Sequence, residues 1–412
     1  MTRRAVEYGC AIVLIGLLAG VAGASTTLLL HAVEHVTYRY TFGTLLTGVE
    51  DSGDLRRALG PMVGGALAGS GWWLLRRRRP VQGMSAVLAG ERLVGSGASL
   101  GREGAPRQLA VAWGDLGREG APRQLAVAWG DLGTSRWALT ARDREILLAC
   151  AAGAGLGAVY SVPLGGALFA TRILLGTWHP RAWGTALITS SLAVAVAAPV
   201  THLQHPLVWP DADLSYLFGF LAVALAPLAV AVGLAFNRLI AAARPITVGR
   251  SAVLIPAIAA AGLLTGVCSI WLPELPGNGR SVLEVSVNSG LTLTAAAAIL
   301  VLKPVLTALF LRAGAVGGML TPALATGAAA GSVVALALNA GAGTALPVAA
   351  VSLTCAAGVL AITQRSPLFA TLFVWELARP PVWLLAVFAL AAFTSAGLVM
   401  LRRRRRSATA AA

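Results

Sequence analysis

Long apolar runs dominate the chain and set its class. Several stretches approach or reach the roughly 20 residues that an α-helix needs to cross a hydrocarbon core. They are rich in Ala, Leu and Gly and lack the alternation of apolar and polar residues found in a membrane β-barrel wall. The pattern therefore predicts an all-α membrane protein with several spans in one polytopic domain, among them residues 11–31, 216–240, 252–272, 291–311 and 381–401.

Composition and charge agree with this class. The 412 residues are 57% hydrophobic and 12% charged, whereas a soluble domain has about 25% charged residues. The formal net charge of +15 comes largely from arginine, including runs at residues 76–79 and 402–406. Basic runs directly against apolar helices mark cytoplasmic helix ends more often than a nucleic-acid surface. We therefore expect no nucleic-acid partner and a basic cytoplasmic tail at residues 402–412.

The N-terminus has some features of a secretory signal, with Arg3 and Arg4 before an apolar run that ends in Ala22-Gly23-Ala24. Because apolar residues resume after Ser25, we favour an uncleaved first helix over cleavage.

Two parts of the chain resemble each other. Residues 151–169 (AAGAGLGAVYSVPLGGALF) and 355–373 (CAAGVLAITQRSPLFATLF) share an Ala-Ala-Gly, a Ser eight residues after that Gly, and then Pro-Leu and Phe. Upstream lie Gly117–Pro122 (GREGAP) and Gly317–Pro322 (GGMLTP). Repeats of apolar segments interrupted by Gly and Pro predict a transporter or channel with two related halves, about 1–205 and 206–401. Chance similarity within a glycine-rich apolar chain is the alternative.

The glycine-flanked segments favour an anion. A helix that begins inside the membrane directs its first backbone N–H groups and its positive dipole end at whatever lies before it, and glycine lets a ligand approach closely. A carboxylate at such a start is a tethered anion, and a carboxylate inside a membrane indicates function. Arg118 is more readily a structural partner of that carboxylate than a substrate ligand. The alternative is a solvated loop between spans.

A tandem repeat gives two candidates for this carboxylate, because residues 101–116 recur as 117–132 and place Glu103 and Glu119 in the same motif. On one helix, a sixteen-residue step rotates the side chain by about 160°, so the two cannot share a face. Pro122 lies 41 residues before Pro163, close to the 45 residues in the second half, whereas Pro106 lies 57 before it. Spacing favours Glu119, although a duplication with a compensating loss, or a sequence error, would also give this pattern.

In this order the motifs resemble those of the CLC family of chloride channels and chloride/proton antiporters, from the first apolar helix to about residue 401. The family's G-R-E-G-P element, which carries its gating glutamate, is matched by both copies with an inserted Ala. Its G-G-x-F-x-P element is similar to Gly317–Pro322, with Leu320 replacing the aromatic residue. LPGNG at 275–279, the Pro-Leu pairs at Pro163 and Pro367, and Glu376 add support.

The resemblance implies a CLC-like inverted repeat of tilted and broken helices, forming a homodimer in the inner membrane with one chloride pathway per subunit. It implies no metal or organic cofactor. Glu119 would be the gate, with Glu103 as second choice. The anion-binding segments would be Gly117, Arg118, Glu119 and Gly120 with Gly317, Gly318, Met319 and Leu320. In these segments the backbone N–H groups of Glu119, Gly120, Met319 and Leu320 would be ligands.

Three departures from the family pattern bear on function. The family's first chloride motif, G-S-G-I-P, is replaced by PVQGMS at 80–85. Thr171, Arg172 and Ile173 stand where the antiporters carry an inner proton-relay glutamate. The family's tyrosine that closes the chloride path from the cytoplasm belongs near the C-terminus, whereas the last tyrosine of this chain is Tyr216. These departures favour passive flux over proton antiport. The alternatives are an inverted-repeat transporter of an organic anion and a non-conducting relic of the family.

We predict that Glu119→Gln changes the rate and pH dependence of chloride flux in liposomes, because it removes the titrating charge at the proposed gate. Glu103→Gln, the same change in the other copy, is the matched control and should leave both unchanged. The reverse result would make Glu103 the gate, and no effect of either change would exclude a gating glutamate in this motif.

Overall fold

A computed structural model describes residues 3–78, 137, 139–201, 209, 217–243, 252–288, 290–315 and 317–411. Within these ranges the regular elements are α-helices and one π-helical segment, which confirms the all-α prediction. Their bounds are α1 (Arg3–Tyr38), α2 (Leu45–Glu50), α3 (Asp54–Arg78), α7 (Ala141–Tyr160), α8 (Pro163–Leu168), η1 (Phe169–Leu174), α9 (Pro180–Thr201), α10 (Leu217–Ala243), α11 (Leu254–Trp271), α12 (Arg280–Val287), α13 (Leu293–Arg312), α14 (Leu320–Gly341), α15 (Val348–Gln364), α16 (Pro367–Ala378) and α17 (Trp383–Ala411).

Among the described residues, seven helices are long and apolar enough to cross a membrane, namely α1, α9, α10, α11, α13, α14 and α17. Each of the five predicted runs falls on one of them, so the prediction of a multi-pass membrane protein is confirmed. Residues 22–25, where a signal cleavage site would lie, are inside α1. The shorter apolar helices α15 and α16, and the α8–η1 unit, complete the bundle.

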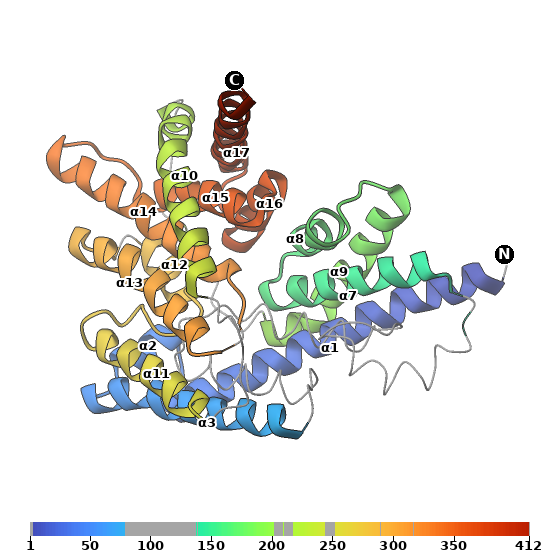
Figure 1. Cartoon of the computed structure of the whole chain (residues 1–412), viewed down its shortest axis with the longest axis horizontal. Coiled ribbons are helices and arrows are strands. Elements are labelled where there is room, and N and C mark those ends of the chain that lie inside the picture. The colour runs from blue at the N-terminus through green and yellow to red at the C-terminus, as the bar shows by residue number, and fades with distance from the viewer. Residues whose placement is uncertain are drawn as a thin grey trace.

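Helices far apart in sequence pack side by side (Figure 1). The first helix, α1, runs along α7 and α9, and its end contacts α2 and α3. A second group consists of α10, α13, α14, α15, α16 and α17, in which α15 contacts α10, α14, α16 and α17. Helix α8 packs on α7 and α9 and also contacts α16, so it joins the two groups. Helix α3 packs along α11.

The two similar segments of the sequence break in the same way. Helix α7 ends before Ser161, which has φ 56° and ψ 41°, and α15 ends before Arg365, with φ 54° and ψ 29°. Two residues later a proline, Pro163 or Pro367, occupies the first position of the next helix. Proline suits that position because its missing N–H would have no partner within the helix. The division into halves at about residue 205 stays a prediction.

Beyond Pro163 the two segments differ. Helix α16 keeps α geometry to Ala378, but α8 changes at Phe169 into the π-helical η1. Within η1 the buried Thr171 hydroxyl donates to the Ala167 carbonyl at 2.8 Å. The Arg172 guanidinium lies 4.3 Å from the ring centre of Trp178.

One carboxylate joins three helices of the first group. Asp143 forms a capping box with Thr140 at the start of α7, and its side chain is 1% exposed. Its Oδ2 lies 2.9 Å from Arg4 Nη2 of α1, and its Oδ1 lies 2.7 Å from Arg181 Nη2 of α9. Because both arginines are partly exposed, this ion-paired group connects the apolar bundle to its polar rim.

We predict that Asp143→Ala lowers the free energy of unfolding by about 2–4 kcal/mol, because it removes a cap and leaves two arginines without their shared buried partner. The measurement is denaturant unfolding in mixed micelles. Glu145→Ala is the control, since Glu145 belongs to the same helix but forms an exposed pair with Arg142 and should change stability by no more than about 0.5 kcal/mol. Equal effects of the two changes would contradict the role given to Asp143.

Candidate functional site

The predicted Gly317–Leu320 segment leads into a helix that begins in the protein interior. Helix α14 starts at Leu320, which is 2% exposed, and the following residues up to Ser332 are all buried. Met319 at the N-cap gives no side-chain hydrogen bond. The positive end of the helix dipole therefore lies in a low-dielectric region, where it favours a negative charge.

Two hydroxyl groups meet at the first turn of α14. The Tyr160 hydroxyl at the end of α7 lies 2.8 Å from Thr321 Oγ1, and the contact is buried. The Tyr160 ring packs edge-on against Phe373 of α16, with ring centres 5.7 Å apart. Helices α7 and α16, which lie far apart in the sequence, thus meet beside the start of α14.

A carboxylate also occupies the start of a second helix, α8, whose first residues are partly exposed. Glu376 of α16 accepts hydrogen bonds from the backbone N–H of Leu164 (2.9 Å, Oε1) and of Gly165 (2.6 Å, Oε2) at the start of α8. A Cβ added at Gly165 would lie 3.2 Å from Phe373 Cδ2 and 3.3 Å from Glu376 Oε2, so glycine permits this approach. A helix start of this fold therefore holds a negative group through two backbone N–H donors.

The chain also buries a cation that the sequence analysis did not identify. Lys303 of α13 is 0% exposed, and its Nζ donates to the carbonyls of Leu275 and Gly277 at 2.7 and 2.8 Å. A Cβ built at Gly279 would lie 3.4 Å from Lys303 Cε and 3.3 Å from the Thr321 carbonyl. Lys303 therefore holds the LPGNG segment against the first turns of α14. A lone lysine inside an apolar span is the signal that could have indicated it.

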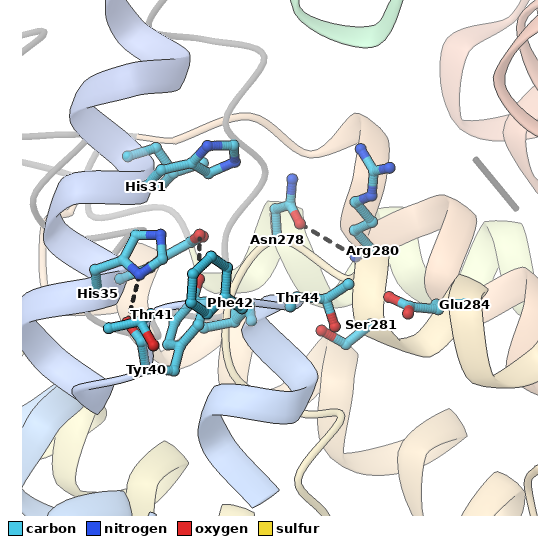
Figure 2. Close-up of a pocket in the computed structure, with 14 residues that line it drawn as sticks. His31, His35, Tyr40, Thr41, Phe42, Thr44, Asn278, Arg280, Ser281 and Glu284 are labelled. Carbon is cyan, nitrogen blue, oxygen red and sulfur yellow. Dashed lines mark hydrogen bonds between the residues drawn. The ribbon is translucent and has the colours of Figure 1, made fainter. Parts of the chain in front are cut away.

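A cavity of about 380 Å³, with charged side chains among its lining, lies beside this segment. Figure 2 shows His31 and His35 projecting from α1 on one side of it, with Asn278, Arg280 and Glu284 on the other. The Nδ1 atom of His35 lies 2.5 Å from the Tyr40 carbonyl, and Asn278 Oδ1 accepts from the backbone N–H of Arg280. The cavity brings groups of both charge signs to the side of α12, which packs on α14.

The first predicted anion segment cannot be placed in this arrangement. Gly117, Arg118, Glu119, Gly120 and the second-choice Glu103 all lie outside the described residues. Gly317, Gly318, Met319 and Leu320 lie at the start of α14, and their binding role stays a prediction.

Comparison with known sequences decides the family. The profile described as "Voltage gated chloride channel" matches residues 76–399, well over half of the chain. The chain belongs to this voltage-gated chloride channel (CLC) family. The resemblance found in the motifs is thereby confirmed.

Relatives of the CLC family match over most of their length. A ClcB-like chloride channel protein of Ralstonia nicotianae is 30% identical over 345 residues, covering 78% of this chain and 77% of the relative. The voltage-gated ClC-type chloride channel ClcB of Escherichia coli O81 (strain ED1a) is 27% identical over 401 residues, covering 88% and 89%.

Solved CLC structures share the fold. The crystal structure of a slow cyanobacterial Cl⁻/H⁺ antiporter matches with a TM-score of 0.71 at 18% identity, over 97% of this chain and 98% of that chain. A CLC-type fluoride/proton antiporter matches with a TM-score of 0.65 at 17% identity, over 95% of each. The predicted CLC-like fold is confirmed.

We predict that Glu376→Gln destabilises this CLC protein by about 1–3 kcal/mol, since an amide offers one acceptor where the carboxylate serves two backbone N–H groups. Glu376→Asp keeps the charge but shortens the side chain, and should also destabilise. Unfolding in mixed micelles measures both, with the exposed Glu145→Gln as control. A Glu376→Gln protein as stable as the control would show that the carboxylate does not hold α8.

Proposed function

We propose that the protein carries chloride, and other small monovalent anions, across the inner membrane through a CLC-type pathway. Membership of the CLC family over residues 76–399 is the observation that carries this proposal. It is supported by the relatives from two bacteria, which are named as chloride channels.

The proposed anion position is in front of the start of α14. The buried dipole end of α14 favours an anion there, and the Tyr160 and Thr321 hydroxyls stand beside it. Backbone N–H groups of Met319 and Leu320 would be ligands from one side, and those of Glu119 and Gly120 from the other. Hydrogen-bond donors alone, with no lysine paired to the anion, offset the free energy of dehydrating the anion and still let it leave. Glu119 would occupy the same place as a gate.

The cavity beside α12 would be the vestibule on the side away from the basic N-terminus. The start of α1 carries Arg3 and Arg4, and the end of α3 carries its own arginine run, whereas the cavity lies at the opposite end of α1. By the positive-inside bias, the cavity then faces the periplasm and the C-terminal tail faces the cytoplasm.

We also propose that the flux is not coupled to protons. The segment expected to carry a proton-relay carboxylate is η1, and its residues Phe169–Leu174 contain no acid. Arg172 stacks on Trp178 there, and Thr171 bonds within its own helix.

The protein would work as a homodimer and not as an enzyme, as the family resemblance implies. The rival functions are transport of an organic anion through the same kind of repeat, and a relic that no longer conducts. An organic anion would need groups that recognise its organic part, and the apolar, glycine-packed start of α14 offers none among the described residues.

Chloride release from liposomes, followed with a chloride and a pH electrode together, tests the proposal. We expect chloride efflux without acidification driven by a chloride gradient. Acidification would show proton coupling and overturn the uncoupled mechanism. Uptake of a carboxylate without chloride efflux would favour the organic-anion transporter, and the absence of both flux and a discrete dimer in detergent would favour the relic.

A further inference from the structure

Two adjoining cavities lie at the end of α1. One is an apolar groove of about 960 Å³ between the last turns of α1 and the first half of α3. The other is a polar cavity of about 460 Å³ formed by the segment after α1 and the turn before α3. Gly53 and Arg56 line both, so the apolar and polar spaces adjoin.

The groove is long enough for much of one lipid chain. Its lining includes Val33 and Val36 from α1, and Leu55 to Leu67 from α3. The twelve helical steps from Leu55 to Leu67 extend over about 18 Å, slightly more than half of a hydrocarbon core about 30 Å thick. Exposed apolar side chains are ordinary on a membrane protein, so the groove alone would indicate nothing specific.

The polar cavity of about 460 Å³ contains charged side chains that can recognise a particular lipid headgroup. Arg39, Arg56 and Asp51 line it. Arg56 Nη1 donates to the Thr37 carbonyl at 3.3 Å. Within the part of the chain that the structure describes, neither arginine forms an ion pair with Asp51 or with any other acid. Two guanidinium groups and one carboxylate therefore line a cavity without neutralising one another.

The neighbouring Tyr40 adds no charge to the cavity. Burial, together with the Glu34 carboxylate, raises the pKa of the Tyr40 phenol, which stays protonated. The charged side chains of this cavity are thus two arginines and one aspartate, and a second aspartate, Asp54, lines the adjoining groove beside Arg56.

The position of these arginines is unusual for a membrane protein. They lie at the end of α1 opposite to Arg3 and Arg4, and at the end of α3 opposite to its own basic run. The positive-inside bias does not account for cations on this side. Tyr38, Tyr40 and Phe42 line the same cavity, and aromatic residues of this kind gather at the level of lipid headgroups.

We propose that the two cavities bind one phosphatidylethanolamine-type lipid. One acyl chain lies in the α1–α3 groove, the phosphate accepts hydrogen bonds from Arg39 and Arg56, and the primary ammonium donates to Asp51. Arginine suits a phosphate because its planar fork gives two parallel hydrogen bonds. A glycerol headgroup would leave Asp51 without an opposite charge, and a choline headgroup has no N–H to donate.

Native mass spectrometry of the delipidated full-length protein tests this, with phosphatidylethanolamine, phosphatidylcholine and phosphatidylglycerol of identical chains. The wild type should bind phosphatidylethanolamine about tenfold more tightly than either of the others, and Arg56→Gln should weaken that binding about tenfold. Asp51→Asn should remove the preference over phosphatidylcholine. Val63→Trp, which fills the groove, should weaken all three.

A matched control separates the ligand contact from effects on the backbone. Arg39→Gln should weaken binding, whereas Arg365→Gln should not, although both arginines are exposed and have nearly the same left-handed φ, 55° and 54°. Arg365 lines neither cavity. Arg39→Gln also keeps the test valid if Arg56→Gln fails to fold. Equal binding by the Arg39 and Arg365 variants, tighter binding of phosphatidylglycerol, or no discrete lipid adduct on the wild type would each overturn the proposal.

Discussion

The rest of this fold depends on one constraint, which is that backbone groups at helix ends need hydrogen-bond partners. The contact of Glu376 with the start of α8 is one way in which the protein supplies them. In a bilayer each backbone group without a partner costs several kcal/mol, so a helix can begin or end at membrane depth only where the protein supplies one. The Glu376 carboxylate supplies two acceptors to α8, and the Lys303 ammonium supplies donors to the carbonyls of the LPGNG segment. A partly exposed carboxylate thus accepts from backbone N–H groups, and a buried ammonium donates to backbone carbonyls.

The starts of α8 and α14 differ in burial and in what stands before them. At the start of α8 a carboxylate from α16 accepts two backbone hydrogen bonds, so this contact serves the architecture. The start of α14 has no side-chain cap at Met319 and faces a pair of hydroxyls. The proposed pathway uses the start of α14 as its anion position.

The sequence predicted the features of the fold that are set by residues close to one another along the chain. Continuous apolar runs identified five spans, because length and composition alone decide whether a helix can cross a membrane. It also predicted that the segments around Pro163 and Pro367 would match, and they break with the same geometry.

The runs named from the sequence omit α9 and α14, whose apolar residues are diluted by Gly, Ser, Thr and Pro. The contacts of Glu376 and of Tyr160 span 211 and 161 residues, a separation over which no periodicity carries information. The gate at Glu119 stays a prediction.

The π-helical turn of η1 has a consequence for how far two related helices can diverge. Arg172 stands nine residues after Pro163, as Glu376 stands nine residues after Pro367. If both helices kept the same pitch, an arginine would face the amide end of α16, where like polarity repels it. Because a π-helix needs more residues per turn than an α-helix, η1 changes the direction in which residue 172 projects, and its guanidinium packs on Trp178 instead. A local change of winding thus lets the α8–η1 segment carry an arginine at the position where α16 carries Glu376.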